Sequence, residues 1–369
     1  MLIYYLLYHS SSTCSNNGGC KNVLDDRNVL KQRDPKGALD IAGSQYQQCL
    51  FESDILDGEH DNRLLKNIVV TGMGGSALAA NIAKTWLSDD LNIPLEIVRD
   101  YTLPAYVDHS TLVIASSYSG NTEETVTCLD EALKRDAQTA VMSAGGKVYD
   151  TAKIHHLAHI DIPAGIQPRM ATIYMLCALT KLLVHFGVTS SKKYNEIAAA
   201  SKWLEDESSH WASDVSTDKN YAKQLALIAV GKTPVFYASS LFMPVAYKWK
   251  ISWNENAKNV AYNGTYPEFN HNEFMGWVSH PIEKPFVIFD LISEDFDSDK
   301  MRQRFALSDK LLSGKRPKSN IIHLKGSGLL RQMLWACVLA DFVSIYVAIL
   351  NGVDPTPVDL IEKFKKELA

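Results

Sequence analysis

The sequence predicts an α/β protein made of two tandem domains, each with a parallel sheet flanked by helices on both faces. Its 369 residues are enough for two domains of ordinary size. Buried-type strands alternate with helical patterns through most of the chain, which is typical of parallel sheets covered on both faces. The alternation stops at the charged segment 190–218 and then starts again, which indicates a duplication of topology rather than of motif.

The first domain is expected over residues 25–189. It begins with helical patterns from Gly37 to Leu56. The strands expected after them are Asn67–Thr71, Leu95–Val98, Leu112–Ser116, Thr139–Ser143 and His159–Ile162. The expected helices are Ser76–Trp86, Thr125–Lys134 and Ala171–His185.

The second domain is expected over residues 219–369, after a helical linker at 190–218. Its expected strands are Pro234–Ala238, Phe286–Asp290 and Asn320–Leu324, and its helices are Phe242–Asn254, Met333–Leu350 and Val358–Leu368. The longest apolar run, Met333–Leu350, contains Asp341 and suits a core helix better than a membrane span, so no membrane partner is expected. Residues 1–24 are interpreted as an extension outside the fold.

Charge and cysteine content narrow the class of protein. A formal charge of −5 leaves no broad basic field, so no nucleic-acid partner is expected and any phosphate must be held by local donors. Six cysteines are too few and too scattered for a disulfide framework in a chain of this length. The sequence contains no C-x-x-C pair, the spacing that would indicate a zinc site. We therefore expect a reducing, cytoplasmic location.

A glycine turn joins the first expected strand to its helix. The segment Val69–Ser76 reads V-V-T-G-M-G-G-S and places unpaired backbone N–H groups and a hydroxyl at a helix N-terminus, where an anion is favoured. It lacks the third glycine of a dinucleotide-binding turn and the Lys-Ser/Thr pair of a P-loop. An ordinary turn that needs glycine for its backbone angles remains an alternative.

A second hydroxyl-rich turn follows the strand Leu112–Ser116. The residues S-S-Y-S-G-N-T-E-E-T at 116–125 lead into the next helix. Ser119 or Asn121 could serve only as a helix cap, but capping and phosphate binding use the same N–H groups and are compatible. Because ligands of parallel sheets bind beyond the carboxyl ends of the strands, the two turns predict one phosphate held between them.

The second half of the chain carries the candidate acid–base groups. Glu255 ends an apolar helix, and His271 lies in the polar stretch Glu268–Glu273. A partly desolvated carboxylate can remove a carbon-bound proton, and a histidine can pass protons between sugar oxygens near pH 7. Those are the two groups that an aldose–ketose isomerisation needs. A helix-end carboxylate and a structural histidine remain the alternatives, and no recognised metal-ligand spacing is present, so neither metal nor cofactor is expected.

Arg169 precedes a strongly apolar helix. An arginine at a buried helix start needs an anion, which could be a neighbouring carboxylate or negative charge on a substrate oxygen.

Six motifs in order resemble the bifunctional phosphoglucose/phosphomannose isomerases, which are built from two sugar isomerase (SIS) domains. They are G-M-G-G-S at 72–76, S-S-Y-S-G-N-T-E-E-T at 116–125, P-A-G-I-Q-P-R at 163–169, N-E-N-A-K at 254–258, E-F-N-H-N-E at 268–273 and D-P-T-P-V-D-L-I-E-K-F-K at 354–365. The resemblance covers the chain from about residue 24 to the end. Phe269 stands where the family usually has leucine, a change expected to affect packing only.

The resemblance implies a role for each matching residue. The sugar 6-phosphate would be held by Gly74, Gly75, Ser76, Ser117, Ser119 and Thr122. Glu255 would move the proton between C1 and C2, and Arg169 would stabilise the cis-enediolate. His271 would assist ring opening, reaching in from the other subunit of a homodimer, together with Lys365, for which Lys363 is a rival. Thr356 is the candidate for accepting mannose 6-phosphate.

Two other classes of function stay open at this point. SIS modules also act as non-catalytic sugar-phosphate sensors, which need the phosphate loops but no base. An amino-sugar phosphate isomerase or deaminase is the other alternative, although no glutamine-processing domain or N-terminal cysteine nucleophile is visible.

Overall fold

The computed structural model describes residues 12–13, 21–278 and 285–368. The chain divides into two compact units, which are described separately. The five-stranded unit is Gln45–Leu204, and the four-stranded unit combines the residues up to Ser44 with those from Glu205 onward.

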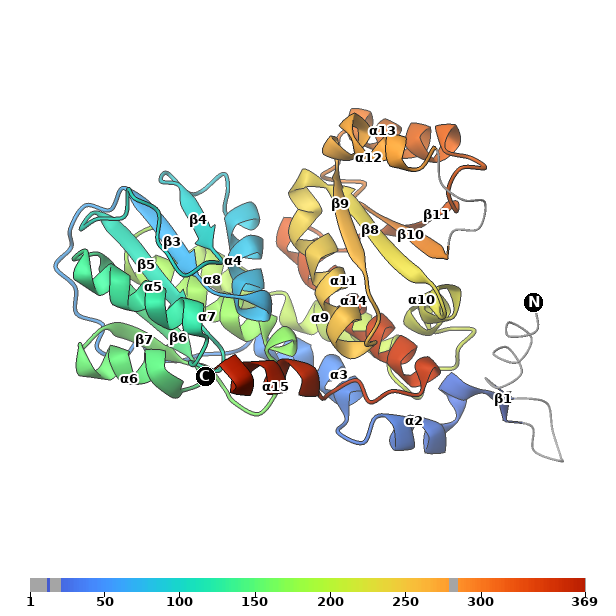
Figure 1. The fold of residues 1–369 in the computed structure, drawn as a ribbon, viewed down its shortest axis with the longest axis horizontal. Coiled ribbons are helices and arrows are strands. Elements are labelled where there is room, and N and C mark those ends of the chain that lie inside the picture. The colour runs from blue at the N-terminus through green and yellow to red at the C-terminus, as the bar shows by residue number, and fades with distance from the viewer. Residues whose placement is uncertain (1–11, 14–20, 279–284, 369) are drawn as a thin grey trace. The chain divides into compact units, whose positions relative to one another are not determined.

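The five-stranded unit has a fully parallel sheet in the order β4-β3-β5-β6-β7. Its strands are β3 (Asn67–Thr71), β4 (Leu95–Val98), β5 (Thr111–Ser116), β6 (Gln138–Ser143) and β7 (Ala158–Asp161). Its helices are α4 (Gly74–Trp86), α5 (Glu123–Lys134), α6 (Gly146–Ile154), α7 (Thr172–His185), α8 (Ser191–Ala198) and most of α9 (Ser201–Ser209), with the 3-10 turn η2 (Pro168–Met170). In Figure 1, α5 and α6 cover one face of the sheet and α4 and α7 the other.

Runs of β-branched residues explain this sheet. Val69, Val113 and Val141 are fully buried on the face covered by α5 and α6, while Ile68 and Val70 alternate to the opposite face and are also fully buried. Near-continuous apolar strands are expected where helices cover both faces of a parallel sheet. The five strands expected from the sequence are confirmed, whereas helix α6 was not expected.

The four-stranded unit repeats the parallel plan in the order β11-β10-β8-β9. Its strands are β8 (Thr233–Ser239), β9 (Tyr262–Tyr266), β10 (Phe286–Ile292) and β11 (Ser319–His323), with the antiparallel pair β1 (Ser12–Thr13) and β2 (Lys21–Asn22) apart from that sheet. Its helices are α2 (Arg27–Arg33), the start of α3 (Ala38–Gln48), α10 (Tyr221–Ala229), α11 (Met243–Asn256), α12 (Glu273–Gly276), α13 (Asp299–Leu311), α14 (Leu329–Asn351) and α15 (Asp359–Leu368). Three 3-10 turns complete it: η1 (Val23–Asp25), η3 (Ser240–Phe242) and η4 (Glu268–His271).

The two faces of this second sheet carry different helices (Figure 1). Phe236 and Phe289 pack with Trp249 of α11, which in turn packs on α14. On the other face Tyr266 packs against Phe305 of α13, within a cluster that also includes the segment η4–α12. The sheet therefore separates α11 from η4, α12 and α13.

Helix α14 is the core helix of the four-stranded unit. It is long and apolar enough to cross a membrane by length and composition, but 94% of its most apolar window is buried inside the protein. It contains Asp341, whose side chain is fully buried and ion-paired. These contacts are those of a core helix, as expected from the sequence.

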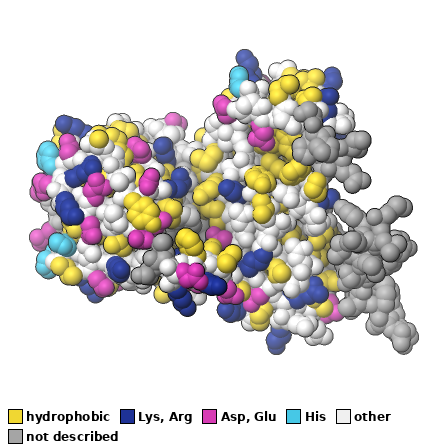
Figure 2. Space-filling view, viewed as in Figure 1, with side chains coloured by type: hydrophobic (Ala, Val, Ile, Leu, Met, Phe, Trp, Pro, Cys, Tyr) yellow, Lys and Arg dark blue, Asp and Glu magenta, His cyan; other side chains and the backbone are white. Residues whose placement is uncertain are grey.

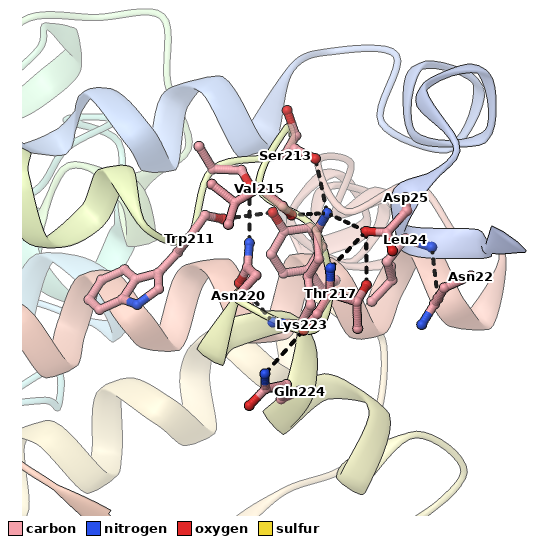
Figure 3. A network of polar contacts seen from close by, with 12 residues as sticks. Asn22, Leu24, Asp25, Trp211, Ser213, Val215, Thr217, Asn220, Lys223 and Gln224 are labelled. Carbon is pink, nitrogen blue, oxygen red and sulfur yellow. Dashed lines mark hydrogen bonds and ion pairs between the residues drawn. The ribbon is translucent and has the colours of Figure 1, made fainter.

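A buried lysine ties the N-terminal segment to the four-stranded unit (Figure 3). Lys223 of α10 donates from Nζ to Asp25 Oδ1 at 3.0 Å and to the carbonyl oxygens of Ser213 and Val215 at 2.9 and 2.7 Å. Burial lowers the pKa of Lys223, and the nearby Asp25 opposes that shift. Asp25 Oδ1 also accepts from Thr217 N and Oγ1, so this one carboxylate binds both α10 and the residues that precede it.

The grouping of the N-terminal helices differs from the expectation of a first domain at 25–189. Residues up to Ser44 pack with the four-stranded unit, since Asp25 binds Lys223 and Arg33 Nη1 donates to the carbonyl oxygen of Ile349 at 2.6 Å. Most of the expected extension 1–24 lies outside the described residues, but Leu24 at its end is fully buried. The segment expected as a linker at 190–218 is helical at α8 and α9.

Candidate active site

The glycine turn lies at the carboxyl end of β3, where α4 begins at Gly74. Gly74 has φ +49°, a left-handed conformation that favours glycine. A Cβ on Gly72 would come within 2.6 Å of the carbonyl oxygen of Ser116, and one on Gly75 within 2.9 Å of Arg169 N. The glycines therefore allow the turn after β3 to pack directly against the end of β5 and against η2.

Hydrogen bonds join this turn to the hydroxyl-rich turn after β5. Tyr118 N donates to Ser76 Oγ at 3.0 Å, and Ser116 Oγ donates to the carbonyl oxygen of Ser76 at 2.9 Å. Ser117 Oγ and Thr122 Oγ1 are 2.9 Å apart. The structure thus brings together the two turns that the sequence predicted to share one edge of the sheet.

Two helices begin at this edge without a side-chain cap. Met73 is the N-cap of α4 and Thr122 the N-cap of α5, and neither makes a side-chain cap hydrogen bond. Backbone N–H groups at such helix starts, with the helix dipoles behind them, favour an anion. Ser119 in the same turn is exposed, with its Oγ 3.4 Å from Asn121 N. The edge can therefore hold a phosphoryl group by neutral donors.

Tyr118 is a residue of this site that sequence reasoning missed. Its hydroxyl donates to the carbonyl oxygen of Pro163 at 2.9 Å and accepts from Ile166 N at 3.3 Å. It therefore fixes the segment that leads to Arg169, and burial raises the pKa of its phenol. A tyrosine amid small hydroxyl residues was the available signal.

Arg169 lies in η2, and only 1% of its surface is exposed. Its Nη1 donates to Gln167 Oε1 at 3.3 Å, and it makes further interactions. Its backbone lies against Gly75, so the structure places Arg169 beside the glycine turn. A buried guanidinium there can stabilise negative charge.

Glu255 lies in the last turn of α11 and is half-buried. Lys258 Nζ donates to the carbonyl oxygen of Glu255 at 2.5 Å and to that of Pro355 at 3.0 Å. Lys258 thereby holds the segment containing Thr356 at the end of α11, and Thr356 N donates to Asp354 Oδ1 at 2.9 Å. Glu255 and the Thr356 segment are thus neighbours, which the sequence did not indicate.

A buried polar network fixes α11 on α14. Lys248 Nζ lies 2.7 and 2.9 Å from the two carboxylate oxygens of Asp341, and Ser252 Oγ donates to Asp341 Oδ1 at 2.7 Å. One turn further along, Asn256 Nδ2 donates to Ser344 Oγ at 2.9 Å. These contacts set the rotation of the helix that carries Glu255.

His271 ends η4 and is exposed. Its segment is anchored on both sides. Asn270 Nδ2 donates to Ser308 Oγ at 2.8 Å, and Tyr237 OH donates to the Glu273 carboxylate. Since η4 lies on the opposite face of the sheet from α11, His271 and Glu255 of one chain sit on elements that the sheet separates.

The two candidate lysines lie on α15. Lys365 Nζ is 3.4 Å from Glu362 Oε1, and Lys363 Nζ is 3.7 Å from Glu367 Oε1, both pairs being largely exposed. Leu360 and Phe364 of the same helix are also exposed, and hydrophobic side chains lie beside charged ones on the face of the protein that Figure 2 shows. These contacts do not choose between Lys365 and Lys363.

Within the described part of the chain, no three His, Cys, Asp or Glu side chains come together as a possible metal site. Glu268 accepts from Asn272 Nδ2 at 2.5 Å, and Glu273 is bound by Tyr237, so these two carboxylates have hydrogen-bond partners in the four-stranded unit.

Comparisons with known proteins match both the five-stranded sheet and the four-stranded sheet to SIS domains. The family described as "SIS domain" matches residues 65–186, and the family described as "Bacterial phospho-glucose isomerase C-terminal SIS domain" matches residues 218–368. A bifunctional phosphoglucose/phosphomannose isomerase of Caldicellulosiruptor bescii is 36% identical over 308 residues, which are 83% of this chain and 90% of that protein. The chain belongs to the bifunctional phosphoglucose/phosphomannose isomerase family.

Further comparisons support the membership. A second bifunctional phosphoglucose/phosphomannose isomerase, from Aquifex aeolicus, is 34% identical over 304 residues, which are 82% of this chain and 90% of that protein. The fold resembles the crystal structure of a glucose-6-phosphate isomerase like protein from Thermus thermophilus, with a TM-score of 0.61 and 18% identity over 93% of this chain and 98% of that one. The tandem SIS architecture expected from the six motifs is confirmed, whereas the role of each site residue stays a prediction.

Proposed function

We propose that this chain interconverts fructose 6-phosphate with glucose 6-phosphate and with mannose 6-phosphate, by metal-free proton transfer through a cis-enediol(ate). The observation that carries the proposal is the 36% identity to a bifunctional phosphoglucose/phosphomannose isomerase along 90% of that relative. The two joined turns of the five-stranded unit support it, because an isomerase of sugar 6-phosphates needs a phosphate site. Glu255, His271 and Arg169 favour an enzyme over a non-catalytic sensor.

The phosphate is assigned to the turns after β3 and β5. Its oxygens would accept hydrogen bonds from backbone N–H groups at the starts of α4 and α5 and from nearby hydroxyl groups. The residues proposed for this role are Gly74, Gly75, Ser76, Ser117, Ser119 and Thr122. The glycines support the assignment, since they let the turn pack against Ser116 and Arg169 and take a left-handed conformation at the start of α4.

The proton transfer is assigned to Glu255. In the direction from aldose to ketose, its carboxylate takes the proton from C2 of the open-chain sugar and returns it to C1, while the proton on O2 passes to O1. Arg169 would stabilise the negative charge of the enediolate. Return of the proton to either face at C2 yields the glucose or the mannose epimer, and contacts worth about 1–3 kcal/mol suffice to bias that choice. Thr356, held near the end of α11, is our candidate for such a contact.

His271 and Lys365 are proposed to open the sugar ring, with His271 acting in the site of the other subunit of a cytoplasmic homodimer. What supports the exchange is the geometry of one chain, in which the sheet of the four-stranded unit separates η4 from α11. An isologous dimer would give each site one histidine from its partner.

Mixed dimers test this exchange. Glu255→Gln and His271→Ala subunits, each inactive alone, are unfolded together and refolded. If His271 acts across the interface, random mixed dimers contain one intact site and about a quarter of the activity returns. If His271 acts in its own chain, no activity returns, and the exchange is wrong.

The reaction itself is tested by a coupled assay on fructose 6-phosphate, with and without a chelator. We expect chelator-resistant formation of glucose 6-phosphate and mannose 6-phosphate. Glu255→Gln should lower kcat by about 10³-fold with little change in KM, because it removes the base and keeps the shape. The exposed Glu59→Gln serves as the control. Chelator-sensitive activity, or a kcat that survives Glu255→Gln, would contradict the mechanism.

A further inference from the structure

The motif N-E-N-A-K at 254–258 covers the end of α11, where the backbone leaves the helix in a strained conformation. Ala257 is the C-cap of α11, and its N–H donates to the carbonyl oxygen of Trp253. Lys258 follows in the left-handed region, with φ +54°. Glycine usually takes this position after a helix, because a Cβ is unfavourable there. A lysine that keeps such a backbone points to a function of its side chain.

The ammonium group of Lys258 binds two backbone carbonyls from separate segments of the four-stranded unit. Its Nζ donates to the carbonyl oxygen of Glu255 at 2.5 Å and to that of Pro355 at 3.0 Å. A lysine suits these contacts, because its ammonium is compact, carries several donors and sits on a flexible stem. One side chain therefore joins the backbone of the proposed base to the residue that precedes Thr356.

The peptide group between Pro355 and Thr356 is held at both ends. Its carbonyl oxygen accepts from Lys258 Nζ, and its N–H donates to Asp354 Oδ1 at 2.9 Å. Because a peptide group is planar, its carbonyl and its N–H cannot turn independently, and the ring of Pro355 fixes φ on the preceding side. Together these constraints set the direction in which the chain enters Thr356.

Two other members of the motif hold the end of α11 itself. Asn254 Oδ1 accepts from Ala261 N at 3.0 Å. Asn256 Nδ2 donates to Ser344 Oγ at 2.9 Å. These bonds fix the helix end to the turn that follows it and to α14, whereas the lysine fixes it to the segment of Thr356.

We infer that Lys258 is a positioning residue that sets the place of Thr356 relative to Glu255, and through it the ratio of mannose 6-phosphate to glucose 6-phosphate formed. This inference rests on the proposed function, in which Glu255 returns the proton to C2 and Thr356 biases the face. A contact that biases the face must lie at a fixed distance from the base. The two backbone contacts of Lys258 provide that constraint without involving a reacting atom.

The test measures the two aldose phosphates formed from fructose 6-phosphate, as initial rates, with the full-length protein. Lys258→Met keeps the length of the side chain and removes the ammonium group. We expect the ratio of mannose 6-phosphate to glucose 6-phosphate to fall about fivefold, and Thr356→Ala should lower it at least as much. The rate of glucose 6-phosphate formation should stay within about threefold of the parent, since Glu255 is retained. The control is Lys232→Met, which removes an ammonium group that donates to the carbonyl oxygen of Ile228 at 2.8 Å.

A double-variant cycle separates this role from capping of the helix. If Lys258 acts through Thr356, adding Lys258→Met to Thr356→Ala changes the ratio no further. If Lys258 only caps α11, the thermal midpoint falls while the ratio stays that of the parent, and the inference is overturned. Effects of the two substitutions that multiply independently would overturn it as well.

Two more variants decide the matter if Lys258→Met does not fold. Lys258→Gly suits the left-handed backbone, so it should fold and show the same fall in the ratio, and an unchanged ratio would overturn the inference. Lys258→Cys alkylated with 2-bromoethylamine regains an ammonium group of similar reach and should regain the parent ratio, with the parent treated in the same way as the control. Failure of the proposed function looks different, because the parent itself would then form neither product.

Discussion

Removal of one partner of the ion pair between Lys248 and Asp341 should strongly destabilise the α11–α14 contact. Both side chains are fully buried, with Nζ–oxygen distances of 2.7 and 2.9 Å, and Ser252 adds a third hydrogen bond to the same carboxylate. Asp341→Leu would leave an ammonium group buried without its counter-charge, which costs about 3–5 kcal/mol. For a unit of this size the thermal midpoint should fall by about 10 °C.

The double variant Lys248→Met/Asp341→Leu separates the pair from the packing around it. It removes both charges and keeps apolar volume, so its free energy of unfolding should return to within about 1 kcal/mol of the parent, or exceed it. Urea unfolding followed by tryptophan fluorescence measures this directly, because Trp249 and Trp253 of α11 are fully buried. The exposed pair of Lys363 provides the control, since Lys363→Met should leave stability unchanged.

Two results would refute this reasoning. A loss below about 1.5 kcal/mol in Asp341→Leu would mean that Lys248 finds water or another partner, so that the site is not dry. A double variant as unstable as Asp341→Leu would mean that apolar groups cannot fill the space.

If the double variant is stable, its kcat reports whether the ion pair also sets the position of Glu255, since Lys248 and Glu255 both lie on α11.

Three further predictions concern single groups. Ser76→Asp should raise KM for fructose 6-phosphate by at least about 10²-fold, because a carboxylate at the start of α4 repels phosphate, and an unchanged KM would place the phosphate elsewhere. Tyr237→Phe removes the hydrogen bond to Glu273 that anchors the segment of His271, so kcat should fall about tenfold with KM little changed. If the thermal midpoint falls as well and kcat of the folded variant is unchanged, the hydrogen bond has a structural role only. Burial raises the pKa of Asp290 to about 6. Between pH 4 and 6 the folded protein therefore holds a proton that the unfolded chain has lost. The free energy of unfolding of the parent, compared with that of Asp290→Asn, should fall by about 3 kcal/mol as pH rises through that window. Urea titrations at each pH measure it.

The proximity of the turns after β3 and β5 could be predicted from sequence because their signals are local. A buried strand, a glycine or hydroxyl turn and a helix start follow one another without a gap at both Gly72–Ser76 and Ser116–Thr122. The rule that ligands bind beyond the carboxyl ends of parallel strands then brings the two turns together without any knowledge of contacts. Hydrogen bonds between Ser76 and the second turn confirm that proximity.

Elements with weak local signals were not predicted. Strand β9 contains Asn263-Gly264, a pair typical of turns, yet it pairs with β8. A glycine fits there because a Cβ on Gly264 would come within 2.8 Å of the Tyr237 ring. The grouping of residues up to Ser44 with the second sheet depends on contacts such as Asp25 with Lys223, which are 198 residues apart. Sequence periodicity carries no information on such pairs.

The proposed phosphate site depends on few side chains and backbone groups rather than on net charge. The chain carries a formal charge of −5, so long-range attraction does not bring phosphate to the first pair of turns. There the anion would find N–H groups that no side chain caps, in a turn made of small hydroxyl residues and glycine. The same scaffold on the second sheet caps its helix with Ser298 and buries Asp297 against Ser293 N. The turns after β5 and β10 therefore share a serine that binds an N–H three residues later, but they differ in whether a side chain caps the helix that follows.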